Sequence, residues 1–185
     1  LLKGEKLTEK NQRQIGYMLQ QDYLLEWRSI LRNVLLGLEI RRELTPESTA
    51  YAKKLLSQYG LEKFESSRPH ELSGGMKQRV GIAMSMTARP KLLLADEPTS
   101  ALDVTIQAEV VREMKKLREQ YQAAIILVTH NMGVASYISD KIGVMCQGKL
   151  VEFGKRDDVI FHPKHEYTRS LLAAVPRLEG KRFAK

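Results

Sequence analysis

The feature that most restricts the fold is an apolar run that ends in two adjacent carboxylates. The run "KLLLAD" (residues 91–96) is continuous, which is typical of a strand buried on both faces of a parallel sheet. A second such run, "AAIILVTH", occupies residues 123–130. The stretch between them places five apolar residues on one helical stripe: Ile106, Val110, Met114, Leu117 and Tyr121. A strand, a crossover helix and a strand predict two parallel neighbours, so we expect an α/β fold.

Helix signals dominate the region before this unit. "IGYMLQ" reads as a short strand at residues 15–20, and helix-like spacing follows over residues 30–38. A further helix is expected from its cap Thr45 to the stop signal Gly60, and another from Met76 to about residue 88. After the second apolar run we expect a hairpin around Gln147-Gly148, and then a turn and a short helix.

These signals divide the chain into three parts. We expect an α/β core formed by residues 1–25 and 89–160. An α-helical subdomain over residues 26–88 interrupts this core, and residues 161–185 form a C-terminal extension.

Composition limits the partners. The net charge of +8 would suit nucleic acid or an anionic membrane face. The basic residues are dispersed, however, and no aromatic residues interleave with them to form a base-stacking surface, so an ordinary solvated surface is favoured. The single Cys146 excludes an internal disulfide, and the longest apolar run, residues 123–128, is too short to span a bilayer.

The two carboxylates, Asp96 and Glu97, come directly after the first buried run. Catalytic groups of parallel α/β sheets gather at the carboxyl ends of the strands. Asp96 could face Mg²⁺ through its water shell, and Glu97 could face a water molecule as a base. A solvated acidic turn is the alternative for the pair alone, but the whole string "KLLLADEPTSALD" argues against it.

Two further polar residues end apolar strands. His130 follows the second buried run and should reach the same sheet edge as Asp96, where it could bond a γ-phosphate. Gln20 ends the first predicted strand, and its amide could contribute an oxygen to Mg²⁺. The bulky group behind it, Tyr23, Leu24, Leu25 and Trp27, is consistent with local packing or with a partner-docking surface.

The loop "LSGGMKQRV" (residues 72–80) places Ser73, Gly74 and Gly75 before a helix. Free backbone N–H groups and the helix dipole make such an end an anion site, and glycine permits close approach. The loop lacks the lysine that follows the glycines of a phosphate loop, and "SGG" alone is a common pattern.

Taken together, these motifs resemble those of the ATPase subunits of ATP-binding cassette (ABC) transporters. The family's Q-loop, signature, Walker B, D-loop and switch histidine occur here in that order, at Gln20, Leu72–Gly75, Leu93–Pro98, Ser100–Asp103 and His130. The resemblance implies a P-loop NTPase fold with a parallel-sheet core and an inserted α-helical subdomain.

The resemblance also implies roles for these residues. Asp96 and Gln20 would serve Mg²⁺, Glu97 would be the catalytic base, and His130 and Gln20 would sense the γ-phosphate. Four signature residues would bind ATP held by the opposite subunit: Ser73, Gly74, Gly75 and Gln78. Ser100 and Asp103 would form the D-loop that communicates across the dimer. Tyr23, Leu24, Leu25 and Trp27 would dock a coupling helix of a membrane subunit.

The sequence departs from the family pattern in two respects. No Walker A motif is present, because the Gly-Lys pairs are followed by Leu150, Arg156 and Arg182. With no initiator methionine either, we expect an N-terminally truncated subunit that is inactive as this chain alone. The two ends of the chain also resemble different subfamilies. Residues 15–40 look like the ATPases of nitrate, sulfonate and taurine importers. Residues 99–117 and 162–180 look like those of oligopeptide, dipeptide and nickel importers.

The function implied by the resemblance is ATP hydrolysis coupled to solute uptake, with a peptide or nickel as the favoured solute. The implied partners are a second ATPase subunit, identical or homologous, transmembrane permease subunits and, indirectly, an extracytoplasmic solute-binding protein, with no nucleic acid. The implied location is the cytoplasmic inner face of the membrane. Alternatives are a nitrate, sulfonate or taurine importer, an inactive fragment, or a soluble ATPase of DNA repair or translation. Residues 20–73 lack the sustained heptads of a repair-type coiled coil.

Overall fold

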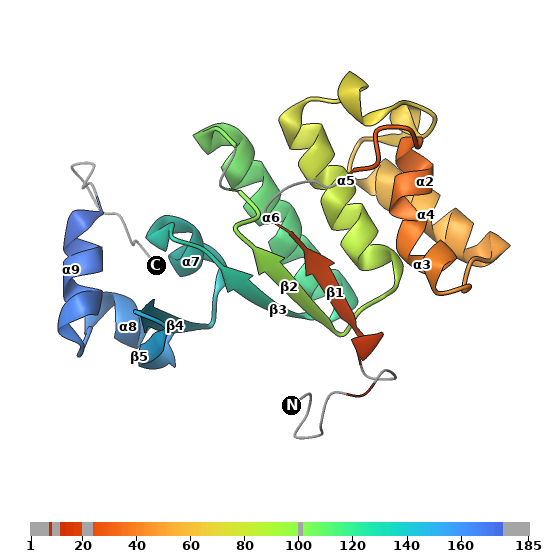
Figure 1. Cartoon of the computed structure of the whole chain (residues 1–185). Coiled ribbons are helices and arrows are strands. Elements are labelled where there is room, and N and C mark those ends of the chain that lie inside the picture. Colours follow the sequence, from red (N-terminus) through yellow and green to blue (C-terminus); the bar gives the residue numbers. More distant parts are fainter. Residues whose placement is uncertain (1–7, 9–11, 20–23, 100–101, 176–185) are drawn as a thin grey trace. The chain divides into compact units, whose positions relative to one another are not determined.

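A computed structural model of the chain describes residues 8, 12–19, 24–99 and 102–175 (Figure 1). The chain divides into two compact units, Leu1–Val128 and Thr129–Lys185, which are treated separately below as unit 1 and unit 2. The α/β core expected from the sequence includes residues on both sides of the boundary between these units. The expected division into core, helical subdomain and extension stays a prediction.

Unit 1 contains a three-stranded parallel sheet. Its strands are β1 (Ile15–Met18), β2 (Leu92–Asp96) and β3 (Ala124–Val128), in the order β1-β2-β3. Asp96 pairs with Val128 in the register of β2 and β3. The predicted parallel pairing of the two apolar runs is therefore confirmed.

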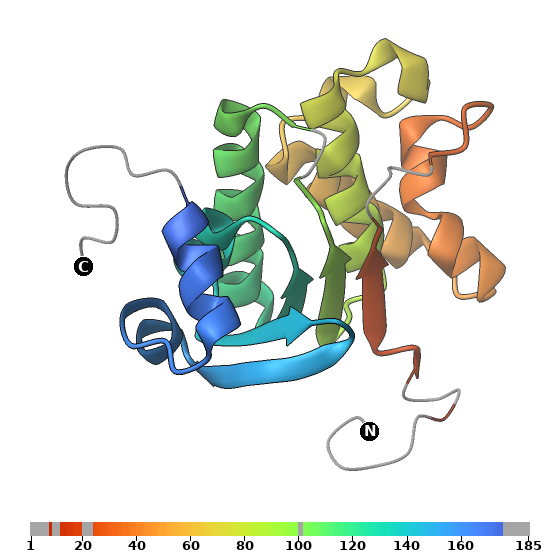
Figure 2. The ribbon, with the colours of Figure 1, turned by 60° about the vertical axis from the view of Figure 1, so that its left-hand side comes forward.

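Helices α5 (Gly74–Thr87) and α6 (Val104–Tyr121) lie on one face of this sheet (Figure 1 and Figure 2). The side chain of Leu93 in β2 and that of Met114 in α6 are both fully buried. Gly16 of β1 lies close to α5, because a Cβ at this position would lie 2.6 Å from the Ser85 carbonyl oxygen. A glycine is therefore what allows β1 to pack against this helix.

Among the described residues of unit 1, none covers the other face of the sheet, which corrects the prediction that the second apolar run is buried on both faces. Tyr17, Leu94 and Ile126 form one row across the three strands, and Tyr17 and Ile126 are 62% and 53% exposed. Val128 is exposed as well. A continuous apolar run requires cover on both faces of its strand, and here the cover provided by α5 and α6 lies on one face.

The helical region of unit 1 comprises α2 (Ile30–Val34), α3 (Leu36–Ile40) and α4 (Pro46–Gln58), followed by two 3₁₀ turns, η1 (Glu62–Phe64) and η2 (Pro69–Glu71). The predicted start and stop of α4 are confirmed. Thr45 Oγ1 accepts a hydrogen bond from the Ser48 backbone N–H (3.0 Å), and Gly60 has a φ of +68°. The core of this region is formed by fully buried leucines: Leu55, Leu56 and Leu61.

Unit 2 comprises α7 (Met132–Ile138), β4 (Lys141–Cys146), β5 (Lys149–Lys155), α8 (Arg156–Phe161) and α9 (Glu166–Ala174). Strands β4 and β5 form the predicted antiparallel hairpin, and Gln147 and Gly148 both have positive φ, as a tight hairpin turn requires. The core of unit 2 comprises Ile142, Val144, Val159 and Ile160. Helices α7 and α8 were not predicted, because six or seven residues are too few for a clear periodic signal. In the part of the chain that the structure describes, no helix is long and apolar enough to cross a bilayer.

Glu152 of β5 fastens the turn before α9. Its carboxylate accepts hydrogen bonds from the backbone N–H groups of Lys164 (2.9 Å) and His165 (3.1 Å). These bonds, that from Lys164 above all, hold the pKa of Glu152 below its usual value. A carboxylate whose pKa is lowered by folding adds stability above its unfolded pKa, and this stability is lost as the pH falls through the folded value.

We therefore expect Glu152→Gln, which keeps the shape and removes the charge, to lower the thermal midpoint of unfolding at pH 7. The difference from wild type should be smaller at pH 3 than at pH 7, because Glu152 loses its charge as the pH falls through its lowered pKa. Calorimetry at the two pH values measures this, with Glu119→Gln on the exposed face of α6 as the matched control. Equal midpoints for wild type and Glu152→Gln at pH 7 would show that these bonds contribute no net stability.

Candidate functional site

The carboxyl end of β2 carries the two predicted acidic residues. Asp96 is the last residue of β2 and is exposed. Glu97 follows with a φ of +46°, which is uncommon for a residue other than glycine, and its backbone N–H donates to the Val128 carbonyl (2.9 Å). The chain thus turns sharply where the sheet ends, and a backbone bond to β3 holds the turn.

The "LSGG" loop begins α5 two residues earlier than predicted. The helix starts at Gly74, and Ser73 is its N-cap, with Oγ accepting from the Met76 backbone N–H at 3.4 Å. A hydroxyl that accepts in this way still has a proton to donate. The first N–H groups of α5 also lack partners within the helix, as at every helix start, so the loop can offer several donors to an anion.

The two glycines of this loop have different surroundings. Gly75 is buried, and a Cβ there would lie 2.8 Å from Ile106 Cγ2 of α6. Gly74 is exposed, and the nearest atom to its hypothetical Cβ is Leu102 Cδ2, at an ordinary 3.8 Å. Packing inside unit 1 therefore explains Gly75 and leaves Gly74 accessible to a group from outside.

Two other predicted residues make bonds inside unit 1. The Gln78 side chain is only 6% exposed, and its amide nitrogen donates to the Pro98 carbonyl. Asp103 caps α6, with Oδ1 accepting from the backbone N–H groups of Thr105 and Ile106 (3.0 Å each). The expected contact of Gln78 with a partner's ATP and the expected role of Asp103 across a dimer stay predictions.

The remaining predicted residues divide into two groups. Gln20, Tyr23 and Ser100 lie outside the described residues. His130 is exposed and belongs to unit 2, two positions after Val128, the residue that pairs with Asp96. Its expected place beside the acidic pair stays a prediction.

The side chain of Asn33 holds the segment around Trp27 in place. Asn33 is fully buried, accepts from the Leu25 backbone N–H (2.8 Å) and donates to the carbonyls of Leu25, Arg28 and Ser29. Leu24 and Leu25 are half-buried, whereas Trp27 is 73% exposed. A large apolar ring is therefore displayed on an ordered loop, which favours docking over local packing for this residue.

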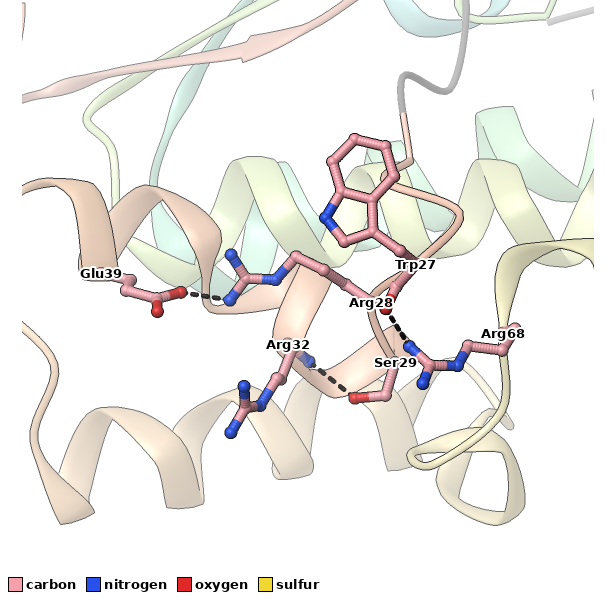
Figure 3. A pocket seen from close by; sticks show the side chains of 6 residues that line it. All are labelled: Trp27, Arg28, Ser29, Arg32, Glu39 and Arg68. Carbon is pink, nitrogen blue, oxygen red and sulfur yellow. Dashed lines mark hydrogen bonds and ion pairs between the residues drawn. The ribbon is translucent and has the colours of Figure 1, made fainter.

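A pocket of about 440 Å³ lies beside Trp27 (Figure 3). Its walls are Trp27, Arg28, Ser29, Arg32, Glu39 and Arg68. Arg28 is paired with Glu39, and the Arg68 guanidinium donates to the Trp27 carbonyl. No hydrogen bond or ion pair from a described residue reaches the exposed Arg32 guanidinium. With three arginines and one carboxylate, the pocket suits a negatively charged group.

Sequence reasoning missed Asn33 and Arg68. Asn33 carried a weak signal, as an amide among apolar residues in "ILRNVLL". Arg68 lies 41 positions from Trp27, and no local pattern indicated their contact. Within the residues the structure describes, no group of three or more His, Cys, Asp or Glu side chains is arranged to hold a metal ion.

Comparison with known families gives the class of the protein. Residues 1–100 match the family model described as "ABC transporter", and residues 151–184 match "Oligopeptide/dipeptide transporter, C-terminal region". The chain belongs to the ABC transporter family. The suspected resemblance is therefore confirmed, and the family implies a P-loop NTPase fold.

Several curated proteins are similar to the chain. It is 43% identical over 194 residues to the oligopeptide transport ATP-binding protein OppF of Streptococcus mutans, an alignment that covers 100% of this chain and 62% of OppF. It is 49% identical over 132 residues to OppD of Bacillus subtilis, covering 70% of this chain and 37% of OppD. It is 47% identical over 135 residues to the glutathione import ATP-binding protein GsiA of Escherichia coli O1:K1 / APEC, covering 71% and 22%. The chain thus spans less than two thirds of the length of each relative.

Proposed function

We propose that the chain belongs to an ATP-binding and ATP-hydrolysing subunit of a bacterial ABC importer, and that the imported solute is a peptide. The observation that carries the proposal is the sharp turn at the end of β2, which follows Asp96 and has Glu97 as its first residue. OppF and OppD are named as oligopeptide transport proteins, which favours a peptide, and the match to OppF covers the whole chain. That coverage favours peptide import over the nitrate, sulfonate or taurine alternative.

In this proposal Asp96 serves Mg²⁺. An exposed carboxylate at the end of a parallel strand fits this ion, which keeps several waters and needs few protein ligands. The ion would offset charge on the phosphates. Glu97 accepts a proton from the attacking water, and Gln20 and His130 contact the γ-phosphate. The phosphate-loop lysine would come from residues outside these 185, since no Gly-Lys-Ser or Gly-Lys-Thr occurs among them.

The α5 N-terminus would act on a different ATP molecule. Ser73 and the first N–H groups of α5 would close on the γ-phosphate held by a second ATPase subunit, and Gly74 would allow close approach. Ser100 and Asp103 would lie at the same dimer contact. Hydrolysis would then require two subunits, each supplying a lid to the other.

Solute uptake measures the proposed solute directly. In cells that lack the gene for this subunit, uptake of a labelled tetrapeptide should be lost, whereas uptake of taurine and of nickel should be retained. Loss of taurine or nickel uptake with normal peptide uptake would instead show that the subunit belongs to a taurine or nickel importer.

The surface around Trp27 would dock a transmembrane subunit at the inner face of the membrane. Trp27 supplies exposed apolar area, and the pocket with Arg28, Arg32 and Arg68 supplies positive charge. An aromatic beside arginines is typical of the residues that dominate protein interfaces. We infer that the docked segment carries a carboxylate that enters this pocket.

Reversing the charge at Arg32 is therefore expected to weaken this docking. Arg32→Glu would place a second carboxylate in the pocket and should reduce co-purification of the transmembrane subunits about tenfold. The fold should be unaffected, because the Arg32 side chain is exposed. Arg42→Glu, another exposed arginine in the same region, is the control. Equal recovery of the membrane subunits with both variants would remove this pocket from the interface.

A further inference from the structure

The loop between β2 and α6 is held by side chains from two helices. It begins at Glu97, whose positive φ is a conformation that surrounding contacts must maintain. Pro98 and Thr99 are buried beside it. The loop ends at Asp103, which caps α6. Glu97, the proposed base, is therefore the first residue of a loop whose shape is maintained by side chains of the neighbouring helices.

Among the described residues, two glutamine side chains donate hydrogen bonds to the loop. Gln78 of α5 donates to the Pro98 carbonyl. Gln107 of α6 donates to the carbonyls of Thr99 and Leu102 (3.0 Å each), so that one amide nitrogen bonds to two residues of the loop. An amide nitrogen has two protons, so one side chain can donate to both carbonyls.

We propose that Gln78 and Gln107 are positioning residues, which keep the loop in the shape that aims the Glu97 carboxylate at the attacking water. Gln78 also connects this loop to α5, the helix that begins with the Ser73–Gly75 lid. Neither amide needs to touch the nucleotide for this role. The assignment rests on the proposed ATPase function, since only there does Glu97 act as a base.

The test is Gln107→Glu, which keeps the size of the side chain and replaces the donating NH₂ group with an oxygen that can only accept. The new carboxylate would face two carbonyl oxygens and should release the loop. In the ATPase subunit that contains these residues, kcat should fall about tenfold or more, with KM for ATP within about twofold of wild type, because the base is misplaced while ATP binding is retained. Gln120→Glu, on an exposed position of the same helix, is the matched control and should leave both constants unchanged.

A second measurement uses the same ATPase subunit without ATP and does not depend on hydrolysis. The Leu102 backbone N–H is bonded to the Thr99 carbonyl (3.2 Å). Its hydrogen exchange should be about tenfold faster in Gln107→Glu than in wild type or in Gln120→Glu, because a local bond has lost its support. Unchanged exchange would show that Gln107 does not hold the loop.

The two measurements separate the possible failures. A wild-type subunit without ATP hydrolysis would refute the proposed function, and the exchange measurement would still decide whether Gln107 holds the loop. Faster exchange with an unchanged kcat would overturn the positioning role. A parallel loss of kcat, ATP affinity and thermal midpoint would assign Gln107 a structural role only.

Discussion

Replacing Glu97 with glutamine is expected to reduce ATP turnover by about 10²–10⁴-fold, the usual contribution of a general base. Glu97→Gln keeps the size of the side chain and removes the group that accepts the proton from water. ATP binding and ATP-dependent dimerisation should remain, since Asp96, Ser73 and Gly74 are unchanged. Phosphate release measures turnover, and size-exclusion chromatography with and without ATP measures dimerisation.

Glu119→Gln, on an exposed position of α6, is the control for this experiment and should hydrolyse ATP at the wild-type rate. Turnover retained by Glu97→Gln would remove Glu97 as the base. Loss of ATP-dependent dimerisation together with turnover would instead assign Glu97 to nucleotide binding.

The second large effect is expected at Gly74. Gly74→Asp would place a negative side chain at the start of α5, where the proposed lid meets a phosphate of the partner's ATP. Repulsion and bulk should reduce hydrolysis by about 10²–10³-fold, as the loss of a well-placed donor does elsewhere. The fold should be retained, because a Cβ at Gly74 would make only an ordinary contact, 3.8 Å from Leu102 Cδ2, and an acidic residue suits the first turn of a helix.

Gly75→Ala gives the contrasting result. Its Cβ would lie 2.8 Å from Ile106 Cγ2, so the Ile106 side chain or the helix that carries it must shift, and the thermal midpoint should fall. Thermal unfolding and ATPase rate, measured on both variants, distinguish a lid residue from a packing residue. A Gly74→Asp variant with normal hydrolysis, or with a lowered midpoint like that of Gly75→Ala, would contradict the assignment of Gly74 to the lid.

The parts of the fold that could be predicted from sequence depend on local signals. Thr45 and Gly60 marked the ends of α4 because capping and a positive φ require particular residue types. The paired apolar runs predicted β2 and β3, because a continuous apolar strand is typical of parallel sheets. Gln147-Gly148 predicted the hairpin turn of unit 2 for a similar local reason.

The parts that could not be predicted depend on contacts between distant segments. In the sequence, Gln78 was assigned to the signature motif, and Gln107 gave no signal of a role. Their bonds to the loop between β2 and α6 are formed only in the folded chain. The exposure of β3 could not be predicted either. An apolar run indicates which residues favour burial, but it does not indicate which helix or strand covers them. The positive φ of Glu97 had no signal, because glutamate rarely adopts it.

In the proposed dimer, the "LSGG" loop of one subunit completes the ATP site of the other. Mixing two inactive subunits, one with Gly74→Asp and the other with Glu97→Gln, measures this directly. If the lid acts between subunits, the mixed dimer contains one site with an unaltered Glu97 and an unaltered Gly74. The mixture should then hydrolyse ATP well above either variant alone, whereas a mixture that dimerises yet stays at the background rate would contradict a lid that acts on the partner's ATP.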